Sequence, residues 1–147
     1  MRTLQTFPSL FTRIAMGKGV GFLVGLTSMV ALSWFMPEAD WPVRWGVLFW
    51  YTTMGAVIGV FGVYDRYPVV EVRVPWWVRG PAIGAWMNFV LALLAHDWLA
   101  RFMEAAFGPA GLLASPFWFI AEGALVGLLI GYLATRHGGE GAPAAGH

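Results

Sequence analysis

Four long runs of apolar residues, separated by short polar stretches, dominate this chain. They cover residues 19–36, 45–64, 80–96 and 117–135. Each run is within the range of roughly 17–25 residues that a helix needs to cross the hydrocarbon core of a bilayer. A helix also satisfies its own backbone hydrogen bonds, which lipid cannot do. The pattern therefore predicts an all-α membrane domain of four transmembrane helices within residues 17–136.

The two ends of the chain follow different patterns. Apolar residues recur at three- and four-residue steps in residues 1–16, which predicts a short amphipathic segment on the cytoplasmic surface of the membrane. A frayed terminus is the alternative, because Pro8 would kink such a helix. The run 19–36 also shares features with a secretory signal peptide, although the basic region before it is long. Residues 137–147 are rich in Gly, Ala and Pro, which predicts a disordered cytoplasmic tail.

The connections between the runs also carry patterns. Residues 65–79 are polar and contain prolines, so we expect an extended loop at the membrane surface that Trp76 and Trp77 anchor. The third run should continue as helix through Glu104, because charged and apolar residues separate onto two faces after residue 96. Such a helix leaves the bilayer or turns along its surface.

The second and fourth runs resemble each other. Residues 49–64 and 117–132 share six identical positions at an offset of 68, and the first and third runs match more weakly at an offset of 61. This predicts two duplicated hairpins inserted in the same direction, a parallel repeat about an axis along the membrane normal. The alternative is that apolar helices with interfacial aromatic residues resemble one another by default.

Glycines recur four positions apart in the runs. In lipid, small residues promote helix association because they let two backbones touch. We expect tight helix–helix contacts, either inside the chain or between copies of it. Because the second and fourth runs share the stripe, we expect these two helices to meet. The predicted packing glycines are Gly17, Gly21, Gly25, Gly55, Gly59, Gly123, Gly127 and Gly131.

Glu122 is the only acidic residue inside a long apolar run. At about 1.5 Å per residue from Pro116, it lies just outside the midplane of a core about 30 Å thick. It is either a proton- or cation-binding group on a pathway, or a neutral or hydrogen-bonded carboxyl that ties helices together. The second interpretation is favoured, because the runs offer no basic partner. The polar residues at similar depth are Asn88, Thr52, Thr53, Thr27 and Ser28.

Composition and charge support a membrane protein. The 147 residues are 59% hydrophobic and only 12% charged, whereas a soluble domain has about 25% charged residues. Seven of the nine Lys and Arg residues fall on one side of the predicted spans, so the positive-inside rule puts both termini in the cytoplasm and the chain in the inner (plasma) membrane. A net charge of +1 gives no general attraction to nucleic acid.

The chain shows little recognisable chemistry. It has no cysteine, no nucleophile–base arrangement, no phosphate loop and no metal-ligand motif, so we expect no enzymatic activity, cofactor or metal. His96 and Asp97 are adjacent and point about 100° apart on a helix, so they do not form a site alone. The leading hypothesis is an inner-membrane protein that acts through helix packing, as a homo-oligomer or as an accessory subunit of a larger membrane complex. The alternative is a small oligomeric channel or transporter with Glu122 as its proton or cation site.

Overall fold

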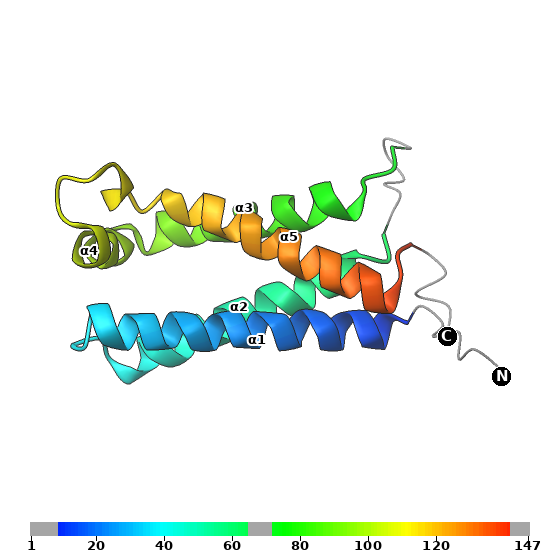
Figure 1. Ribbon diagram of the computed structural model, residues 1–147, viewed down its shortest axis with the longest axis horizontal. Helices are drawn as coiled ribbons and strands as arrows, with labels where there is room; N and C mark the ends of the chain where they lie inside the picture. The colour runs from blue at the N-terminus through cyan, green and yellow to red at the C-terminus, as the bar shows by residue number, and fades with distance from the viewer. Residues whose placement is uncertain (1–8, 65–71, 142–147) are drawn as a thin grey trace.

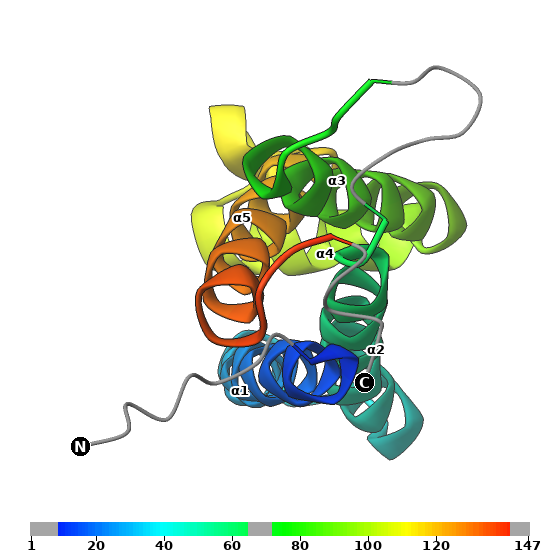
Figure 2. The same cartoon turned by 90° about the vertical axis from the view of Figure 1, so that its right-hand side faces the viewer.

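The computed structural model describes residues 9–64 and 72–141, and the elements there are helices, which confirms the all-α prediction. The helices α1, α2, α3 and α5 lie side by side along the long axis, and α4 lies across one end (Figures 1 and 2). Their bounds are α1 (Leu10–Phe35), α2 (Trp41–Phe61), α3 (Trp76–Leu94), α4 (His96–Phe107), the 3-10 turn η1 (Leu112–Ala114) and α5 (Trp118–Gly138).

Three of the described helices, α1, α3 and α5, are long and apolar enough to cross a membrane. Their outward faces carry large apolar side chains, among them Trp34 (82% exposed) and Leu125 (68% exposed). Such a surface is typical of contact with lipid, because soluble monomers rarely expose large apolar patches. The helix α2 has 21 residues but a lower mean hydropathy, since Arg44 and several Trp, Tyr and Thr residues interrupt its apolar sequence.

The four long helices form two hairpins, in which α1 packs along α2 and α3 packs along α5. Glycines lie at the contact between the two helices of each hairpin. A Cβ atom on Gly17 would collide with the carbonyl oxygen of Gly55, and a Cβ on Gly55 with that of Gly17. Gly84 and Gly123 meet in the same reciprocal way in the second hairpin. Each hairpin is therefore joined by direct backbone contact.

All eight predicted packing glycines are buried against another helix of the same chain. The contact partners differ from the prediction, however. The glycines of α5 face α3, and those of α2 face α1. The second and fourth runs do meet, as expected, but through the apolar side chains of one core cluster and not through their glycines: Tyr51, Met54 and Ile58 of α2 with Val126 and Ile130 of α5. Small residues favour close approach of any helix, and in this chain each stripe packs against the other helix of its own hairpin.

The first helix begins earlier than predicted. Because α1 runs without a break from Leu10 to Phe35, residues 10–16 are its first turns and not a separate amphipathic segment. Ser9 caps this helix: its hydroxyl oxygen accepts a hydrogen bond from the Thr12 N–H at 3.0 Å. Lys18, which suggested a boundary, is simply exposed on the helix surface. Residues 1–8 lie outside the described residues.

The third run also differs from the prediction at both ends. The helix α3 begins at Trp76, within the expected loop, so Pro81 lies inside the helix and not in its first turn. At the other end, Ala95 leaves helical geometry (φ −117°, ψ 30°). The chain therefore turns, and α4 runs across the end of the bundle (Figure 1). Leu99 and Met103 on one face of α4 are buried.

The opposite end of the bundle is built around Arg13 and Arg79, and we call it the arginine end. Arg13 is 1% exposed. Its Nε donates to the Gly59 carbonyl oxygen (3.1 Å), and its Nη1 donates to the Thr135 hydroxyl (3.3 Å) and to the Gly139 carbonyl oxygen. These acceptors belong to the last turns of α2 and α5, where free carbonyls and the helix dipole favour a cation.

Arg79 joins the same end to the last described residues of the chain. Its Nη2 forms an ion pair with Glu140 Oε1 at 2.7 Å. Its Nη1 donates to the carbonyl oxygens of Tyr64 (3.0 Å) and Val74 (2.9 Å). The Gly141 N–H also donates to the Gly62 carbonyl oxygen at 3.1 Å.

The prediction of a disordered tail from residue 137 is therefore wrong for residues 137–141. The helix α5 extends to Gly138, and the ion pair of Glu140 holds the residues that follow. Composition alone could not reveal that Arg79, which is distant in sequence, pairs with Glu140 and fixes the position of this segment. Residues 142–147 lie outside the described residues.

Candidate functional site

Glu122 is hydrogen-bonded to two other helices. Its Oε2 accepts from the Tyr51 hydroxyl of α2 (2.8 Å) and from Asn88 Nδ2 of α3 (2.7 Å). Asn88 Nδ2 also donates to the Phe119 carbonyl oxygen (2.9 Å), and Asn88 Oδ1 accepts from Trp50 Nε1 (3.0 Å). We call these five residues the polar cluster. It links α2, α3 and α5.

The glycine contact of the second hairpin positions the polar cluster. Asn88 is fully buried. A Cβ atom on Gly123 would lie only 2.8 Å from both Cβ and Nδ2 of Asn88. The absence of a side chain at Gly123 therefore lets Asn88 reach the backbone of α5 and the carboxyl one residue before Gly123. The same glycine thus permits both the close helix contact and the hydrogen bond between Asn88 and Glu122.

The structure brings together only part of the predicted polar layer. Asn88 lies at Glu122, but the hydroxyls of Thr27 and Thr52 donate to carbonyls of their own helices, and Thr53 is exposed. Ser28 also donates to its own helix, at the Val24 carbonyl oxygen, and lines the cavity described below. The rise per residue predicts the depth of a residue but not the direction in which it points, so the predicted layer was too wide.

Tyr51 and Trp50 contribute polar side-chain atoms to the cluster that the sequence prediction missed, and Phe119, which was also missed, contributes only its backbone carbonyl. Aromatic residues near the ends of a span are usually interfacial anchors. Both residues, however, lie in the middle of α2, where a buried Tyr or Trp needs a partner for its O–H or N–H. Their position in the middle of an apolar run could therefore have identified them as members of a buried polar site.

A cavity of about 470 Å³ lies between the two hairpins, beside the polar cluster and beneath α4. Its size is in the range of roughly 300–1,000 Å³ that is typical of ligand pockets. The walls are almost entirely apolar and aromatic, and Glu122, Tyr51 and Ser28 supply the polar side chains. The lining residues are Ser28, Leu32, Val43, Gly46, Val47, Trp50, Tyr51, Leu91, Ala95, Trp98, Leu99, Phe102, Phe119 and Glu122.

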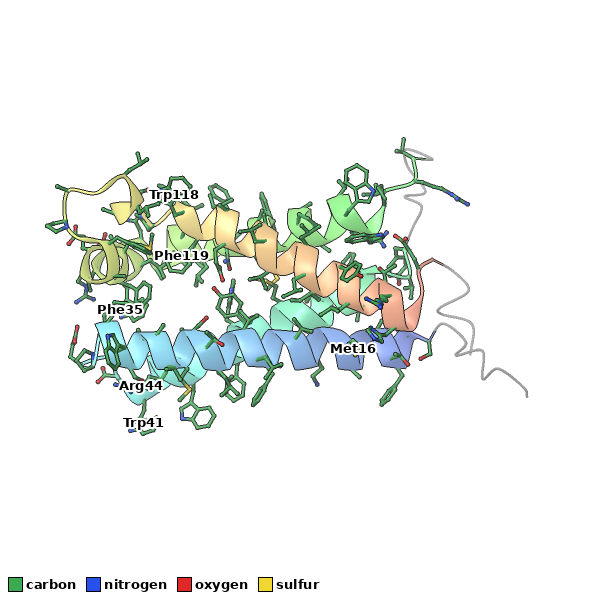
Figure 3. The ribbon with its side chains drawn as sticks, in the orientation of Figure 1. Met16, Phe35, Trp41, Arg44, Trp118 and Phe119 are labelled. Atoms are coloured by element: carbon green, nitrogen blue, oxygen red, sulfur yellow. The ribbon has the colours of Figure 1, made fainter. Side chains whose placement is uncertain are left out.

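Aromatic contacts connect α4 to the long helices above the cavity. The Phe102 ring of α4 lies 6.0 Å from the Phe35 ring of α1, edge to face, and 6.0 Å from the Phe119 ring of α5. Figure 3 shows Phe35 and Phe119 at the same end of the bundle as α4. Trp98 stacks on Phe102, with ring centroids 6.5 Å apart. The amphipathic helix α4 thus covers one side of the cavity with aromatic side chains.

His96 and Asp97 lie at the start of α4. Contrary to the expectation that they point apart, His96 Nδ1 is 3.2 Å from Asp97 Oδ1. Both side chains are exposed, and neither lines the cavity. In residues 9–64 and 72–141, no three His, Cys, Asp or Glu side chains gather where they could hold a metal ion.

Comparison with known proteins gives no relative. The chain matches no family model, no curated protein and no solved structure. The cavity and the polar cluster are therefore the features that bear on function.

Proposed function

We propose that this chain is a non-enzymatic inner-membrane protein with four transmembrane helices, and that it binds a small, largely apolar molecule in the cavity between its hairpins. The observation that carries the proposal is a cavity of about 470 Å³ with apolar and aromatic walls and one carboxyl, Glu122. A concave apolar site with a few convergent polar groups is the usual form of a small-molecule site.

The pairing of α2 with α1 supports a fourth span. The 21 residues of α2 extend about 31 Å, which matches a hydrocarbon core of about 30 Å. Its backbone touches that of α1 at Gly55, and α1 is itself long and apolar enough to cross. A helix fixed to a membrane-spanning neighbour in this way shares its depth.

The arginine end supports a cytoplasmic position for both termini. The start of α1 and the end of α5 lie at this end of the bundle (Figure 1). It also contains Arg13, Arg79 and the exposed Arg136. Positive residues accumulate on the cytoplasmic side of inner-membrane proteins.

Equivalent contacts support duplicated hairpins. Gly17 meets Gly55 in the first hairpin as Gly84 meets Gly123 in the second. The first helices then correspond at an offset of 67 and the second helices at 68. An offset of 67 aligns these contacts of the first and third runs, whereas the offset of 61 suggested by the sequence does not.

The two functions expected from sequence have less support. The eight glycines that suggested an oligomer or an accessory subunit make their contacts inside the chain. A channel or transporter would need polar groups along a continuous path, but Thr27 and Thr52 bond their own helices. Glu122 and Asn88 belong to one cluster at the side of a cavity. That arrangement suits binding.

Two glycines provide a matched test. Gly46 lines the cavity and Gly19 does not, and an added Cβ atom at either position would meet nothing within 4 Å. Gly46→Leu should therefore fill part of the cavity, and Gly19→Leu should add an equal side chain outside it. Neither variant should disturb the backbone contacts of the hairpins.

The measurement is photo-crosslinking with benzophenone, a neutral apolar probe, on the purified protein in lipid nanodiscs. Mass spectrometry would locate the labelled residues. We expect labels on the cavity wall around Trp98 and Phe102 in the parent chain and in Gly19→Leu, and their loss in Gly46→Leu. Equal labelling of these residues in all three proteins would contradict the proposal, because the cavity would then not be the binding site.

A further inference from the structure

We propose that the molecule bound in this cavity is a hydrophobic organic cation, held by the Glu122 carboxylate and by the surrounding aromatic rings. This inference rests on the proposed binding function and adds the charge of the ligand to it. Three features of the cavity carry it: the sign of its charge, the position of the carboxyl oxygens and the number of aromatic side chains.

The charge of the cavity wall has one sign. Glu122 is the only acidic side chain among the lining residues, and no Lys, Arg or His lies among them. The two buried arginines in residues 9–64 and 72–141, Arg13 and Arg79, bind their partners at the opposite end of the bundle. A carboxylate in apolar surroundings is costly without a compensating positive charge. A cationic ligand supplies that charge, and an anionic ligand would be repelled.

The carboxyl has one oxygen left for a ligand. Tyr51 and Asn88 both donate to Oε2, whereas Oε1 accepts no hydrogen bond from the described residues. Because Glu122 also lines the cavity, Oε1 is the atom placed to meet a bound molecule. The two donors hold the carboxyl in one orientation, so a ligand would meet a preorganised group.

Aromatic rings surround the rest of the cavity. Trp50, Tyr51, Trp98, Phe102 and Phe119 all line it. The face of an aromatic ring attracts a cation, and this attraction is strongest where water is excluded. The same rings provide an apolar surface for the body of the ligand. A carboxylate together with aromatic walls therefore selects for a molecule that is both hydrophobic and positive.

Two ions of the same shape and opposite charge test the inference: tetraphenylphosphonium and tetraphenylborate. Their binding would be measured by equilibrium dialysis against the full chain in nanodiscs, with empty nanodiscs subtracted to remove partition into lipid. We expect the parent chain to bind the phosphonium at least about tenfold more tightly than the borate, because the Glu122 carboxylate attracts one ion and repels the other across the cavity. Equal binding of the two ions would overturn the inference.

Two variants locate the source of the selectivity. Glu122→Gln keeps an oxygen acceptor for Tyr51 and Asn88 but removes the charge, so phosphonium binding should weaken about tenfold or more. Gly46→Lys places a positive charge on the cavity wall and should reverse the preference toward the borate. Gly19→Lys is its control and should keep the preference of the parent chain. The inference would be overturned if both Glu122→Gln and Gly46→Lys bound the phosphonium as tightly as the parent chain does.

The failure of the inference differs from the failure of the binding function. If Gly46→Leu abolishes benzophenone labelling but the parent chain does not distinguish the two ions, the cavity binds molecules without regard to charge. The inference then falls and the proposed function stands. If Gly46→Leu changes neither benzophenone labelling nor phosphonium binding, both fall.

Discussion

The two ends of the bundle use buried polar groups in different ways. At the arginine end, Arg13 and Arg79 bind the carbonyls at the ends of helices, and Glu140 completes the set with an ion pair. At the cavity end, Glu122 accepts from the described residues on Oε2 alone and lines a cavity whose walls are apolar and aromatic. Arginines that donate to the carbonyls of several segments hold the helices together, whereas a carboxyl with one oxygen left beside a cavity is available to a ligand.

The largest expected effect is on folding, when a leucine replaces a glycine at a tight helix contact instead of at the cavity. Gly55, near the arginine end, and Gly46, at the cavity, are both in α2. A Cβ on Gly55 would overlap the Gly17 carbonyl oxygen, whereas one on Gly46 would meet nothing within 4 Å. Gly55→Leu should therefore prevent correct folding, and Gly46→Leu should be tolerated. Size-exclusion chromatography in mild detergent checks this, and a monodisperse Gly55→Leu protein would contradict the close contact.

A second effect concerns the arginine end directly. Arg13→Met removes a buried cation and leaves carbonyl oxygens of α2 and α5 unpaired, which should lower the free energy of unfolding by about 2–3 kcal/mol. Arg136→Met is the control, because Arg136 is exposed and should change stability by less than about 0.5 kcal/mol. Both values come from denaturant unfolding in detergent. Equal stability of the two variants would show that Arg13 does not brace this end.

The smallest effect on stability is expected at the cavity end. Glu122→Gln keeps an oxygen that accepts from Tyr51 and Asn88, so the free energy of unfolding should change by less than about 1 kcal/mol. Glu122→Leu removes that acceptor and should cost about 1–3 kcal/mol, because both donors are left unpaired. The same unfolding assay applies. If Gln costs as much as Leu, the charge of Glu122 stabilises the fold, and its role as a free binding group is contradicted.

The sequence predicted which segments are helical better than it predicted where each helix begins and ends. Apolar runs reveal helices because lipid demands internal hydrogen bonding, and the four predicted runs became α1, α2, α3 and α5. Their boundaries depended on tertiary partners. The last turns of α5 and the residues after it are held by Arg13 and Arg79, which are far away in the chain. In the sequence, these arginines looked like ordinary cytoplasmic flanks of the spans.

The candidate site was predicted in part for a similar reason. Glu122 and Asn88 were found because polar residues in an apolar run are rare. Tyr51 was missed because an aromatic residue fits an apolar run without contrast. Thr52 was included because it lies at the right depth, but its hydroxyl bonds the carbonyl of Leu48 on its own helix. Depth can be counted along a helix, whereas the direction of a side chain depends on how helices rotate against one another.

The central claim is that the cavity beside Glu122 binds a hydrophobic cation. The most direct measurement is an experimental structure of the protein with tetraphenylarsonium, in which the anomalous scattering of arsenic marks the ligand. We predict one arsenic peak in the parent protein, enclosed by α2, α4 and α5 next to the Glu122 carboxyl, and its loss in Glu122→Gln. An empty cavity, or a peak only on the lipid-facing surface, would contradict the claim.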